Sequence, residues 1–415
     1  MTEQLNTPEL RFPEFKREWK EYQFQTHLSK IETGTNKLGS EDFLGLPLLK
    51  MGNIQRGNFS FNKLEKLKKD EVVNKEHLIQ NKDFLFNTRN TMELVGKSAT
   101  WRGESNKFAF NSNIARLTLE NMDTVFFNYL YNTPKLIHKV KSLAVGTTSV
   151  AAIYPRDLKK LKYFIPIFDE QLKIGEFFSK LDQQIELEEK KLELLEQQKR
   201  GYMQKIFSQD LRFKDENGNE YPNWKKRKIQ DLMEVTSVKR IHQSDWQTNG
   251  VPFLRARDIV AYNKGDKIEE PLFISYDKYN AYSKISGKVE KGDLLVTGVG
   301  TIGIPFLIKD NKPLYFKDGN IIWLKNQKKL NENFLFYSFL STSIQNYIKR
   351  VAGVGTVGTF TIKNAKKTPI FEPIKEEQEK IGNFFSKLDE LINKQNQKID
   401  GLKKRKRGFL QKMFV

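Results

Sequence analysis

A segment of 35 residues occurs twice in this chain, and this repeat limits the possible folds more than any other property of the sequence. Residues 173–207 and 380–414 align without a gap at an offset of 207, and 18 of the 35 positions are identical. A repeat of this kind indicates a chain built as two copies of one plan. Each copy has a variable lobe followed by a well-matched segment, which divides the chain into 1–165, 166–207, 208–372 and 373–415.

Upstream of the matched segments the two copies agree only in short motifs. Each motif lies at a similar place in its own half of the chain. The shared motifs are Leu-Arg-Phe (10–12 and 211–213), Trp-Lys (19–20 and 224–225) and Pro-Ile-x-x-Glu-Gln (166–171 and 373–378). The lobes have therefore diverged while their frame has been kept.

The matched segments are predicted to be long helices with a coiled-coil seam. Apolar residues recur at alternating steps of four and three over more than four heptads, which is the a/d pattern of a coiled coil. Polar residues interrupt the seam at the same two places in each copy, Glu188 and Lys199 in the first and Gln395 and Lys406 in the second. The predicted seam residues are Ile174, Phe178, Leu181, Ile185, Leu192 and Leu195 in the first helix, and Ile381, Phe385, Leu388, Ile392, Ile399 and Leu402 in the second.

The polar interruptions also give a prediction for the register of the two helices. If the helices pair antiparallel about a pseudo-twofold axis, Glu188 lies beside Lys406 and Lys199 lies beside Gln395. Such a pairing would fix the register at some cost in stability. The alternative, in which these side chains reach water independently, is equally open.

The lobes are predicted to be mixed α+β or α/β domains. Short runs rich in Phe, Tyr, Ile and Val, broken by Gly, Asn and Asp, are typical of short strands. One helix is expected near the end of each lobe, at residues 124–140 and 332–351, and a Gly-rich turn follows it at 146–148 and 353–358.

Charge is the compositional property that bears most on function. The chain has 71 Lys and Arg against 51 Asp and Glu, a formal net charge of +20, which favours a polyanionic partner. Most of this charge lies outside the helices, since residues 170–207 carry a net −1 and 375–415 a net +5. No apolar run is long enough to span a membrane, no export signal is evident, and there is no cysteine, so a cytoplasmic location is expected.

The motifs that suggest catalysis do not have the required context. Two Gly-x-Gly-x-x-Gly stretches, at 298–303 and 353–358, lack the strand-to-helix setting of a dinucleotide site and are interpreted as turns. The four histidines are far apart, and no tetrapeptide of the type that amino-group DNA methyltransferases use is present. No site for methyl transfer, DNA cleavage or ATP hydrolysis, and no metal site, is therefore predicted, and the chain is interpreted as a binding protein.

At this point the sequence resembles a known family, the specificity subunits of type I restriction-modification systems, often called HsdS. The resemblance covers essentially the whole chain. It rests on the opening Leu-Arg-Phe and Trp-Lys of each half, the Pro-Ile-x-x-Glu-Gln motif, and the Ile-Gly-x-Phe-Phe-Ser-Lys-Leu-Asp helix starts at Ile174 and Ile381.

The resemblance implies two target-recognition domains, separated by two long helices that form an antiparallel coiled coil. Each domain would read one half of a bipartite double-stranded DNA site. It also implies two methyltransferase subunits, which use S-adenosylmethionine, and motor-nuclease subunits, which use ATP and Mg²⁺; this chain would hold no cofactor. A related system whose single partner fuses nuclease and methyltransferase remains an alternative.

Residues that contact DNA are predicted among basic, amide and hydroxyl side chains in turn-rich segments. Arg and Asn suit bidentate contacts with guanine and adenine, although a phosphate contact is the commoner role for any one of them. The candidates are Lys50, Asn53, Arg56, Arg89, Asn90, Lys97 and Arg102 in the first lobe, and Arg255, Arg257, Thr297, Thr301 and Thr356 in the second.

Overall fold

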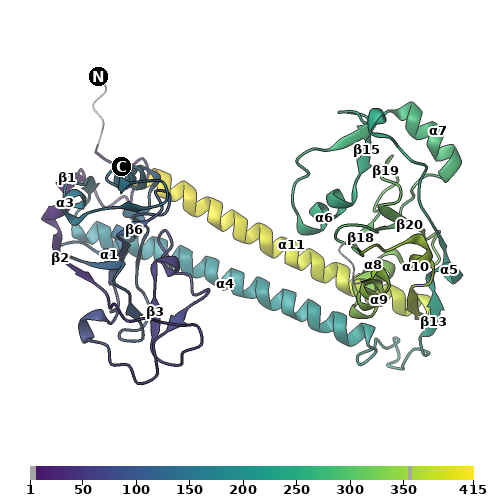
Figure 1. Ribbon diagram of the computed structural model, residues 1–415, viewed down its shortest axis with the longest axis horizontal. Helices are drawn as coiled ribbons and strands as arrows, with labels where there is room; N and C mark the ends of the chain where they lie inside the picture. Colours follow the sequence, from purple (N-terminus) through teal and green to yellow (C-terminus); the bar gives the residue numbers. More distant parts are fainter. Residues whose placement is uncertain (1–5, 354–357) are drawn as a thin grey trace. The chain divides into compact units, whose positions relative to one another are not determined.

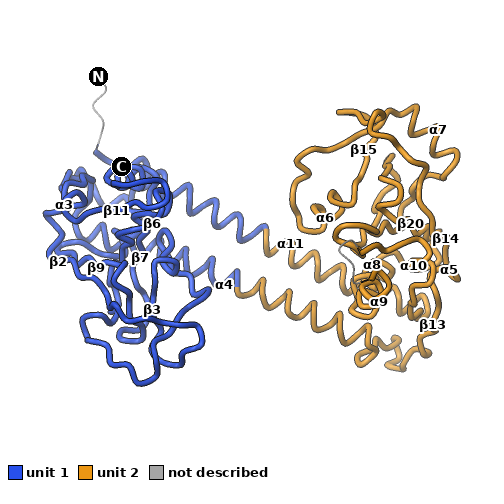
Figure 2. Tube along the Cα trace, in the orientation of Figure 1, with its two compact units in different colours: residues 1–189, 397–415 blue, residues 190–396 orange. Residues whose placement is uncertain are grey.

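The computed structural model describes residues 6–353 and 358–415. The chain divides into two compact units, Met1–Glu189 with Gln397–Val415, and Lys190–Asn396 (Figure 2). Both long helices, α4 (Phe168–Phe207) and α11 (Lys375–Lys412), contribute residues to both units. Each unit therefore contains one lobe, the start of the helix that follows this lobe, and the end of the other helix.

Unit 1 contains short strands and helices before α4, as Figure 1 shows. Its strands are β1 (Lys20–Gln23), β2 (Leu28–Thr33), β3 (Pro47–Leu49), β4 (Glu65–Lys66), β5 (Phe84–Asn87), β6 (Arg89–Asn90), β7 (Ser98–Thr100), β8 (Ala109–Phe110), β9 (Ile114–Leu119), β10 (Val145–Gly146), β11 (Ala151–Ala152) and β12 (Lys162–Ile165). Its helices before α4 are α1 (Thr124–Tyr131), α2 (Pro134–Lys141) and α3 (Pro155–Leu158), with 3₁₀ turns at Phe24–Thr26, Met51–Asn53 and Lys75–His77.

Unit 2 repeats this order with α-helices in place of the three 3₁₀ turns. Its strands are β13 (Lys225–Lys228), β14 (Glu234–Thr236), β15 (Val251–Leu254), β16 (Leu272–Ile274), β17 (Leu294–Thr297), β18 (Pro305–Leu307), β19 (Tyr315–Phe316), β20 (Ile321–Lys325) and β21 (Pro369–Glu372). Its helices besides α4 and α11 are α5 (Ile229–Leu232), α6 (Ala256–Lys264), α7 (Tyr276–Ser286), α8 (Glu332–Leu340), α9 (Thr342–Ala352) and α10 (Ile362–Lys366), with a 3₁₀ turn at Gln243–Asp245.

The sheets of the two lobes have the same topology. In unit 1 an antiparallel sheet has the order β2-β9-β5-β7, and in unit 2 the corresponding order is β14-β20-β17-β18. The three-stranded sheets β4-β3-β8 and β16-β15-β19 correspond in the same way, as do the ladders β1-β12 and β13-β21. A further small sheet, β10-β11-β6, is present in unit 1. The α+β class and the internal repeat are thus confirmed.

The central strands form because most of their residues are apolar and both of their faces are covered. All four residues of β5 and all four of β17 are buried, as are the first four of β9 and of β20. A short continuous apolar run of this kind is typical of a fully covered strand. One face is covered by α1 and α2 in unit 1 and by α8 and α9 in unit 2. The other face packs on a three-stranded sheet of the same lobe, β4-β3-β8 in unit 1 and β16-β15-β19 in unit 2.

The prediction of one helix near the end of each lobe is wrong, because each predicted helix is two helices. Thr133 caps α2, its hydroxyl accepting from the Leu136 N–H, and Pro134 occupies the first helical position, where a missing N–H costs nothing. In unit 2, Ser341 caps α9 through the N–H of Ile344. The break lets the second helix change direction, and the apolar periodicity does not reveal it.

The core of each lobe is completed by the end of the helix from the other copy. In unit 1 the ring of Phe414 packs on Trp19 and Phe126, and Met413 is buried in the same cluster. In unit 2 the ring of Phe207 stacks on Phe334 and Phe385, beside the buried Ile206. Each lobe therefore borrows part of its core from a segment outside its own copy.

All twelve predicted seam residues are buried or half-buried. In unit 1, Ile174, Phe178 and Leu181 lie in the core of the lobe, so the first turns of α4 serve the lobe as well as the helix pair. Ile381 and Phe385 do the same in unit 2.

A buried clamp joins the first residues of lobe 1 to the start of α4. Both guanidinium donors of Arg11 reach the carboxylate of Glu170 at 2.7 Å, and the indole N–H of Trp19 also points to it at 3.4 Å. Glu170 is fully buried. The neighbouring Gln171 side chain accepts the N–H of Asp123, the residue that caps α1.

The same clamp recurs in unit 2. Arg212 donates to Glu377 at 2.7 and 3.2 Å, the Trp224 indole donates at 2.9 Å, and Gln378 accepts the N–H of Asn331, the cap of α8. The three short motifs that the copies share are therefore the parts of two equivalent clamps, which attach each lobe to its helix.

We expect Arg212→Met to destabilise unit 2 by about 3–5 kcal/mol, because it leaves the buried carboxylate of Glu377 without its cation. The measurement is the midpoint of the unit 2 transition in thermal unfolding, which should fall by about 10 °C. Arg227→Met is a matched control, since it removes the exposed pair with Glu372 and should cost under about 1 kcal/mol. Equal effects of the two changes would contradict the clamp.

The two helices run antiparallel within each unit, in a register that differs from the prediction. In unit 1, Lys406 pairs with Asp182 at 2.5 Å and Lys398 with Glu188 at 2.5 Å. The predicted contact between Glu188 and Lys406 is therefore wrong, because Lys406 pairs six residues earlier in α4.

Unit 2 shows the same displacement. Lys199 pairs with Asp389 at 2.5 Å, six residues before the predicted partner Gln395. The physical reason is that both lysines also lie over a tyrosine ring of a lobe, at 5.4 Å for Lys406 and Tyr129 and at 5.6 Å for Lys199 and Tyr337. The register depends on the lobes as well as on the helices.

Candidate nucleic-acid interface

A prominent loop of unit 1 connects β5 to β7 and spans residues 88–97. It is closed at its base by a hydrogen bond of 3.1 Å from the Gly96 N–H to the Asn87 carbonyl. Its first residues form β6, which pairs antiparallel with β11. The hairpin of β10 and β11 thus lies against this loop, and the hairpin tip at 147–150 is exposed.

Residues 55–57 lie under the same loop. The Lys97 ammonium donates to the Gln55 side chain at 2.7 Å, and the Arg56 guanidinium donates to the carbonyl of Glu93 at 3.3 Å. We call residues 55–57, 88–97 and 145–152 the loop cluster. It brings together four of the predicted DNA contacts, Arg56, Arg89, Asn90 and Lys97.

The loop cluster contains three cations and one carboxylate, that of Glu93, which opposes the lowering of the Lys97 pKa without forming an ion pair in the part of the chain that the structure describes. In the described residues no ion pair is formed by Arg56, Arg89 or Lys97. Burial lowers the pKa of Arg56, and burial together with the neighbouring Arg56 lowers the pKa of Lys97. Two cations held side by side in this way favour an anion nearby, since an anion would relieve both their desolvation and their repulsion.

Hydroxyl groups complete the surface of the loop cluster. Thr147, Thr148 and Ser149 are exposed at the hairpin tip, and Arg89 is exposed on the adjoining strand β6. Arginine, amide and hydroxyl groups are the side chains that contact phosphates and base edges. The hydroxyls of the tip were not among the predicted contacts, although the Gly-rich turn at 146–148 was the signal for them.

Unit 2 has the same connection at the same place. The loop after β17, residues 298–303, is closed by the Gly303 N–H donating to the Thr297 carbonyl at 2.8 Å. The N–H of Phe360 donates to Gly298 at 2.8 Å, as that of Ile153 does to Thr88 at 3.0 Å in unit 1. Glycine is required at 298 because a Cβ there would lie 2.7 Å from the Phe360 carbonyl oxygen. The turn interpretation of this Gly-x-Gly-x-x-Gly stretch is confirmed; the second stretch lies partly outside the described residues.

Three predicted contacts of the first lobe have partners within the protein. The Lys50 ammonium pairs with Glu65 at 2.6 Å, and the buried Asn53 side chain accepts the N–H of Lys50. Arg102 donates to the Tyr129 hydroxyl. These bonds hold the lobe together, and the DNA role of these residues stays a prediction.

The five predicted contacts of the second lobe differ in accessibility. Arg257 and Thr301 are exposed, Arg255 forms an ion pair of 2.8 Å with the buried Asp258, and Thr297 is fully buried with its hydroxyl donating to the Thr301 carbonyl at 2.6 Å. Thr356 lies outside the described residues. Among the described residues, Arg257 and Thr301 are therefore the exposed candidates of this lobe, and Arg257 pairs with Glu270 at 3.3 Å.

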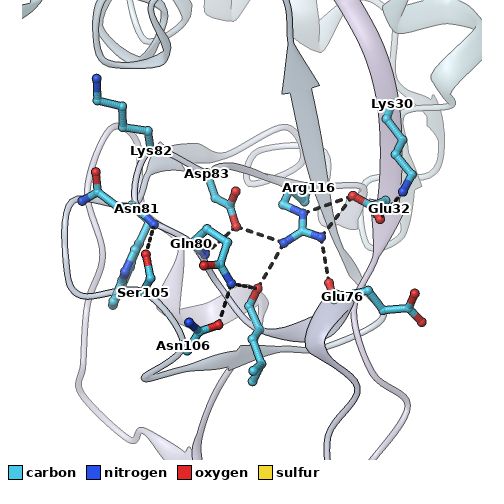
Figure 3. Close-up of polar contacts among 12 residues, drawn as sticks. Lys30, Glu32, Glu76, Gln80, Asn81, Lys82, Asp83, Ser105, Asn106 and Arg116 are labelled. Carbon is cyan, nitrogen blue, oxygen red and sulfur yellow. Dashed lines mark hydrogen bonds and ion pairs between the residues drawn. The ribbon is translucent and has the colours of Figure 1, made fainter.

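Figure 3 shows a polar network that supports the sheet of lobe 1. The Arg116 guanidinium, on β9, lies between the carboxylates of Glu32 at 3.1 Å and Asp83 at 3.2 Å, and it also donates to the carbonyls of Glu76 and Leu78. All its donors are used within the lobe, so we assign it a structural role. In lobe 2 the corresponding place holds Trp323, whose indole donates to the buried Asp293 at 2.8 Å.

Metal sites, the histidines and membrane-spanning helices were also considered from the sequence. Among the described residues, no group of three or more His, Cys, Asp or Glu side chains is arranged to hold a metal ion. The buried His27 bonds the Tyr163 hydroxyl at 3.0 Å, and burial lowers the pKa of His27. No described helix is long and apolar enough to cross a membrane.

Comparison with known proteins agrees with this architecture. The family model described as type I restriction modification DNA specificity domain matches residues 28–197 and 221–404, once for each half. The chain is 25% identical over 361 residues to the type I restriction enzyme MjaVIII specificity subunit of Methanocaldococcus jannaschii, covering 81% of each chain.

Solved structures share the fold across the whole chain. The S subunit of a type I restriction-modification system from M. genitalium superposes with a TM-score of 0.59 at 16% identity, covering 99% of both chains. A chain solved in work on complex assembly and conformational transition of the type I R-M system gives a TM-score of 0.52 at 15% identity, with 95% and 97% covered.

Two equivalent α+β lobes, each clamped to a long helix, define a protein that carries two copies of one domain. The chain belongs to the family of type I restriction-modification DNA specificity proteins.

Proposed function

We propose that this chain is the sequence-recognition subunit of a type I restriction-modification complex, and that each lobe reads one half of a bipartite DNA site. The observation that carries the proposal is the loop after β5 in lobe 1 and the loop after β17 in lobe 2, which have the same closing bonds but unrelated sequences. A shared frame that presents different loops is suited to reading two different half-sites.

The chemistry of the loops fits DNA. Arg89 and Asn90, with the hydroxyls of the hairpin tip, offer donors to phosphates and to base edges in the major groove. The excess of basic residues in the lobes supplies the sequence-independent part of the affinity. Binding should therefore weaken as salt concentration rises.

The catalytic steps are assigned to partner subunits. In this proposal two methyltransferase subunits transfer a methyl group from S-adenosylmethionine to adenine, and motor-nuclease subunits use ATP and Mg²⁺ to translocate and cut unmodified DNA. The chain itself directs them to the site in the cytoplasm and has no activity alone.

The test is an exchange of the first lobe, residues 1–165, for the corresponding lobe of a relative. Methylated adenines are then mapped genome-wide in strains that carry the native or the exchanged gene together with the partner genes. We expect one half of the methylated motif to change and the other half to stay. A change in both halves, or methyl transfer by the purified chain without partners, would contradict the proposal.

The alternative, a related system with one fused nuclease-methyltransferase partner, is decided by copurification. Separate methyltransferase and motor subunits that copurify with the tagged chain support type I, and one fused partner supports the alternative.

A further inference from the structure

One set of contacts in unit 1 joins three segments that are far apart in the sequence. The Tyr129 hydroxyl, on α1 of the lobe, donates to the Asp182 carboxylate on α4 at 2.6 Å. The other carboxylate oxygen of Asp182 pairs with Lys406, which comes from α11 and lies over the Tyr129 ring. A lobe, its own helix and the helix of the other copy therefore meet at one carboxylate.

Unit 2 contains the same set with the copies exchanged. The Tyr337 hydroxyl, on α8, donates to Asp389 on α11 at 2.6 Å, and Asp389 pairs with Lys199 of α4 at 2.5 Å. Lys199 lies over the Tyr337 ring at 5.6 Å. We call each set a Tyr–Asp–Lys triad. Its occurrence in both units, with equal Tyr–Asp distances, indicates that the contact is part of the repeated fold and does not arise by chance.

The triads also account for a feature of the sequence that packing alone does not. Lys199 and Lys406 occupy seam positions where an apolar residue would stabilise the helix pair, and Asp182 and Asp389 end the repeated Ser-Lys-Leu-Asp motif. Each Lys is only partly exposed, at 23% and 25%. A partly buried polar contact of this kind selects one arrangement among several that apolar contacts would allow.

Directional bonds are needed at this place because the surrounding contacts are aromatic. Tyr129 packs on Phe178, and Tyr337 packs on Phe385, with ring centroids 5.0 and 5.1 Å apart. Such contacts supply attraction but change little when one ring slides or turns on another. A short bond from a buried tyrosine to a carboxylate is lost by the same movement.

We propose that Asp182 and Asp389 are positioning residues that fix the orientation of each recognition lobe on the helix pair, and thereby the length of the unspecified gap between the half-sites. The part that concerns the gap rests on the proposed function. The residues touch no DNA; they act through Tyr129 and Tyr337, which belong to the lobes.

The two triads differ in one respect that the test can use. In unit 1 Arg102 also donates to the Tyr129 hydroxyl and lies 3.8 Å from Asp182. Among the described contacts of unit 2, no arginine donates to the Tyr337 hydroxyl. Lobe 1 therefore has a second bond that holds its tyrosine, and lobe 2 depends on Asp389 and Lys199. The variants are best placed in unit 2.

The first measurement uses the purified chain alone. The chain has no cysteine, so Lys349→Cys on α9 and Lys394→Cys on α11, both exposed and both in unit 2, accept spin labels without background. We expect the distribution of label distances to broaden when Tyr337→Phe or Asp389→Asn is added. Arg227→Met, which removes an ion pair elsewhere in unit 2, is the matched control and should leave the distribution unchanged.

The second measurement is the methylated motif in cells with the partner subunits. With Tyr337→Phe, methylation at sites whose gap is one base pair longer or shorter should rise about tenfold relative to the native gap, as expected when one charge-assisted hydrogen bond no longer excludes other orientations. Both half-sequences should stay unchanged. In the native Tyr337 background, Asp389→Glu keeps a carboxylate for the hydroxyl and should retain part of the selectivity that Asp389→Asn loses.

The outcomes separate this inference from the proposed function. An unaltered distance distribution in Tyr337→Phe and Asp389→Asn, together with unaltered gap selectivity, would overturn the inference. If the native chain directs methylation to no bipartite site, the proposed function fails, whereas the distance measurement still decides whether the triad holds the lobe. A variant that loses half-site sequence as well would count against a positioning role.

Discussion

Arg89→Glu is expected to reduce DNA binding by roughly 10²-fold, because it removes a donor from the loop cluster and places a carboxylate against the phosphates. Arg89 is exposed on β6 and has no ion pair among the described contacts, so the protein itself should lose little stability. The measurement is the dissociation constant for a duplex that carries the methylated motif, at fixed salt concentration.

Lys20→Glu is the matched control, since it makes the same change of net charge in the same lobe, on β1, which belongs to a different sheet from β6 and β11. It should weaken binding by less than about threefold through the long-range field alone. If Lys20→Glu and Arg89→Glu weaken binding equally, only overall charge matters and the loop cluster is not the interface. The milder Arg89→Ala distinguishes the type of contact, since loss at all sequences indicates a phosphate and relaxed specificity in one half-site indicates a base.

Insertion of one heptad in each long helix is expected to lengthen the unspecified gap of the motif by about three base pairs. Seven residues add about 10 Å of helix while keeping the seam in phase, and DNA rises about 3.4 Å per base pair. Equivalent points are after Glu189 in α4 and after Asn396 in α11, where the compact units divide. The described contacts within each unit are then retained.

The readout is again the map of methylated adenines. Both half-sequences should persist with a longer gap between them. Four inserted residues at the same points put the seam out of phase and should abolish directed methylation. An active seven-residue variant whose gap is unchanged would show that the helices do not set the distance.

The repeat and the helices were accessible from the sequence because their signals are local and periodic. The seam from Ile174 to Leu195 is read from spacing alone, and the α+β class follows from short apolar runs such as that of β5. The division of each predicted helix was missed, because Thr133 and Ser341 break a helix through a cap that leaves the apolar pattern intact.

Contacts between segments that are far apart in the chain could not be predicted from the sequence. The Arg, Trp and Glu of each clamp could be recognised as shared motifs. The sequence does not show, however, that Arg11 and Glu170 form an ion pair. The helix register was misplaced because Tyr129 and Tyr337, which help to set it, belong to the lobes. Burial was also misjudged, since Thr297 has the residue type of a DNA contact yet lies inside a sheet.

The exchange of helix ends between the two lobes has a consequence for synthesis of the protein. Residues 203–207, which complete the core of lobe 2, precede it in the chain, so this lobe can close as soon as its own residues and the start of α11 have left the ribosome. Lobe 1 is made first, yet Phe409, Met413 and Phe414, which cover its aromatic core, are made at least 200 residues later. Trp19 and Phe126 therefore stay uncovered for most of translation, which adds about 5–20 residues per second. The half of the molecule that is synthesised first is the last to be sealed, and it is the half most exposed to chaperones and proteases while the chain is growing.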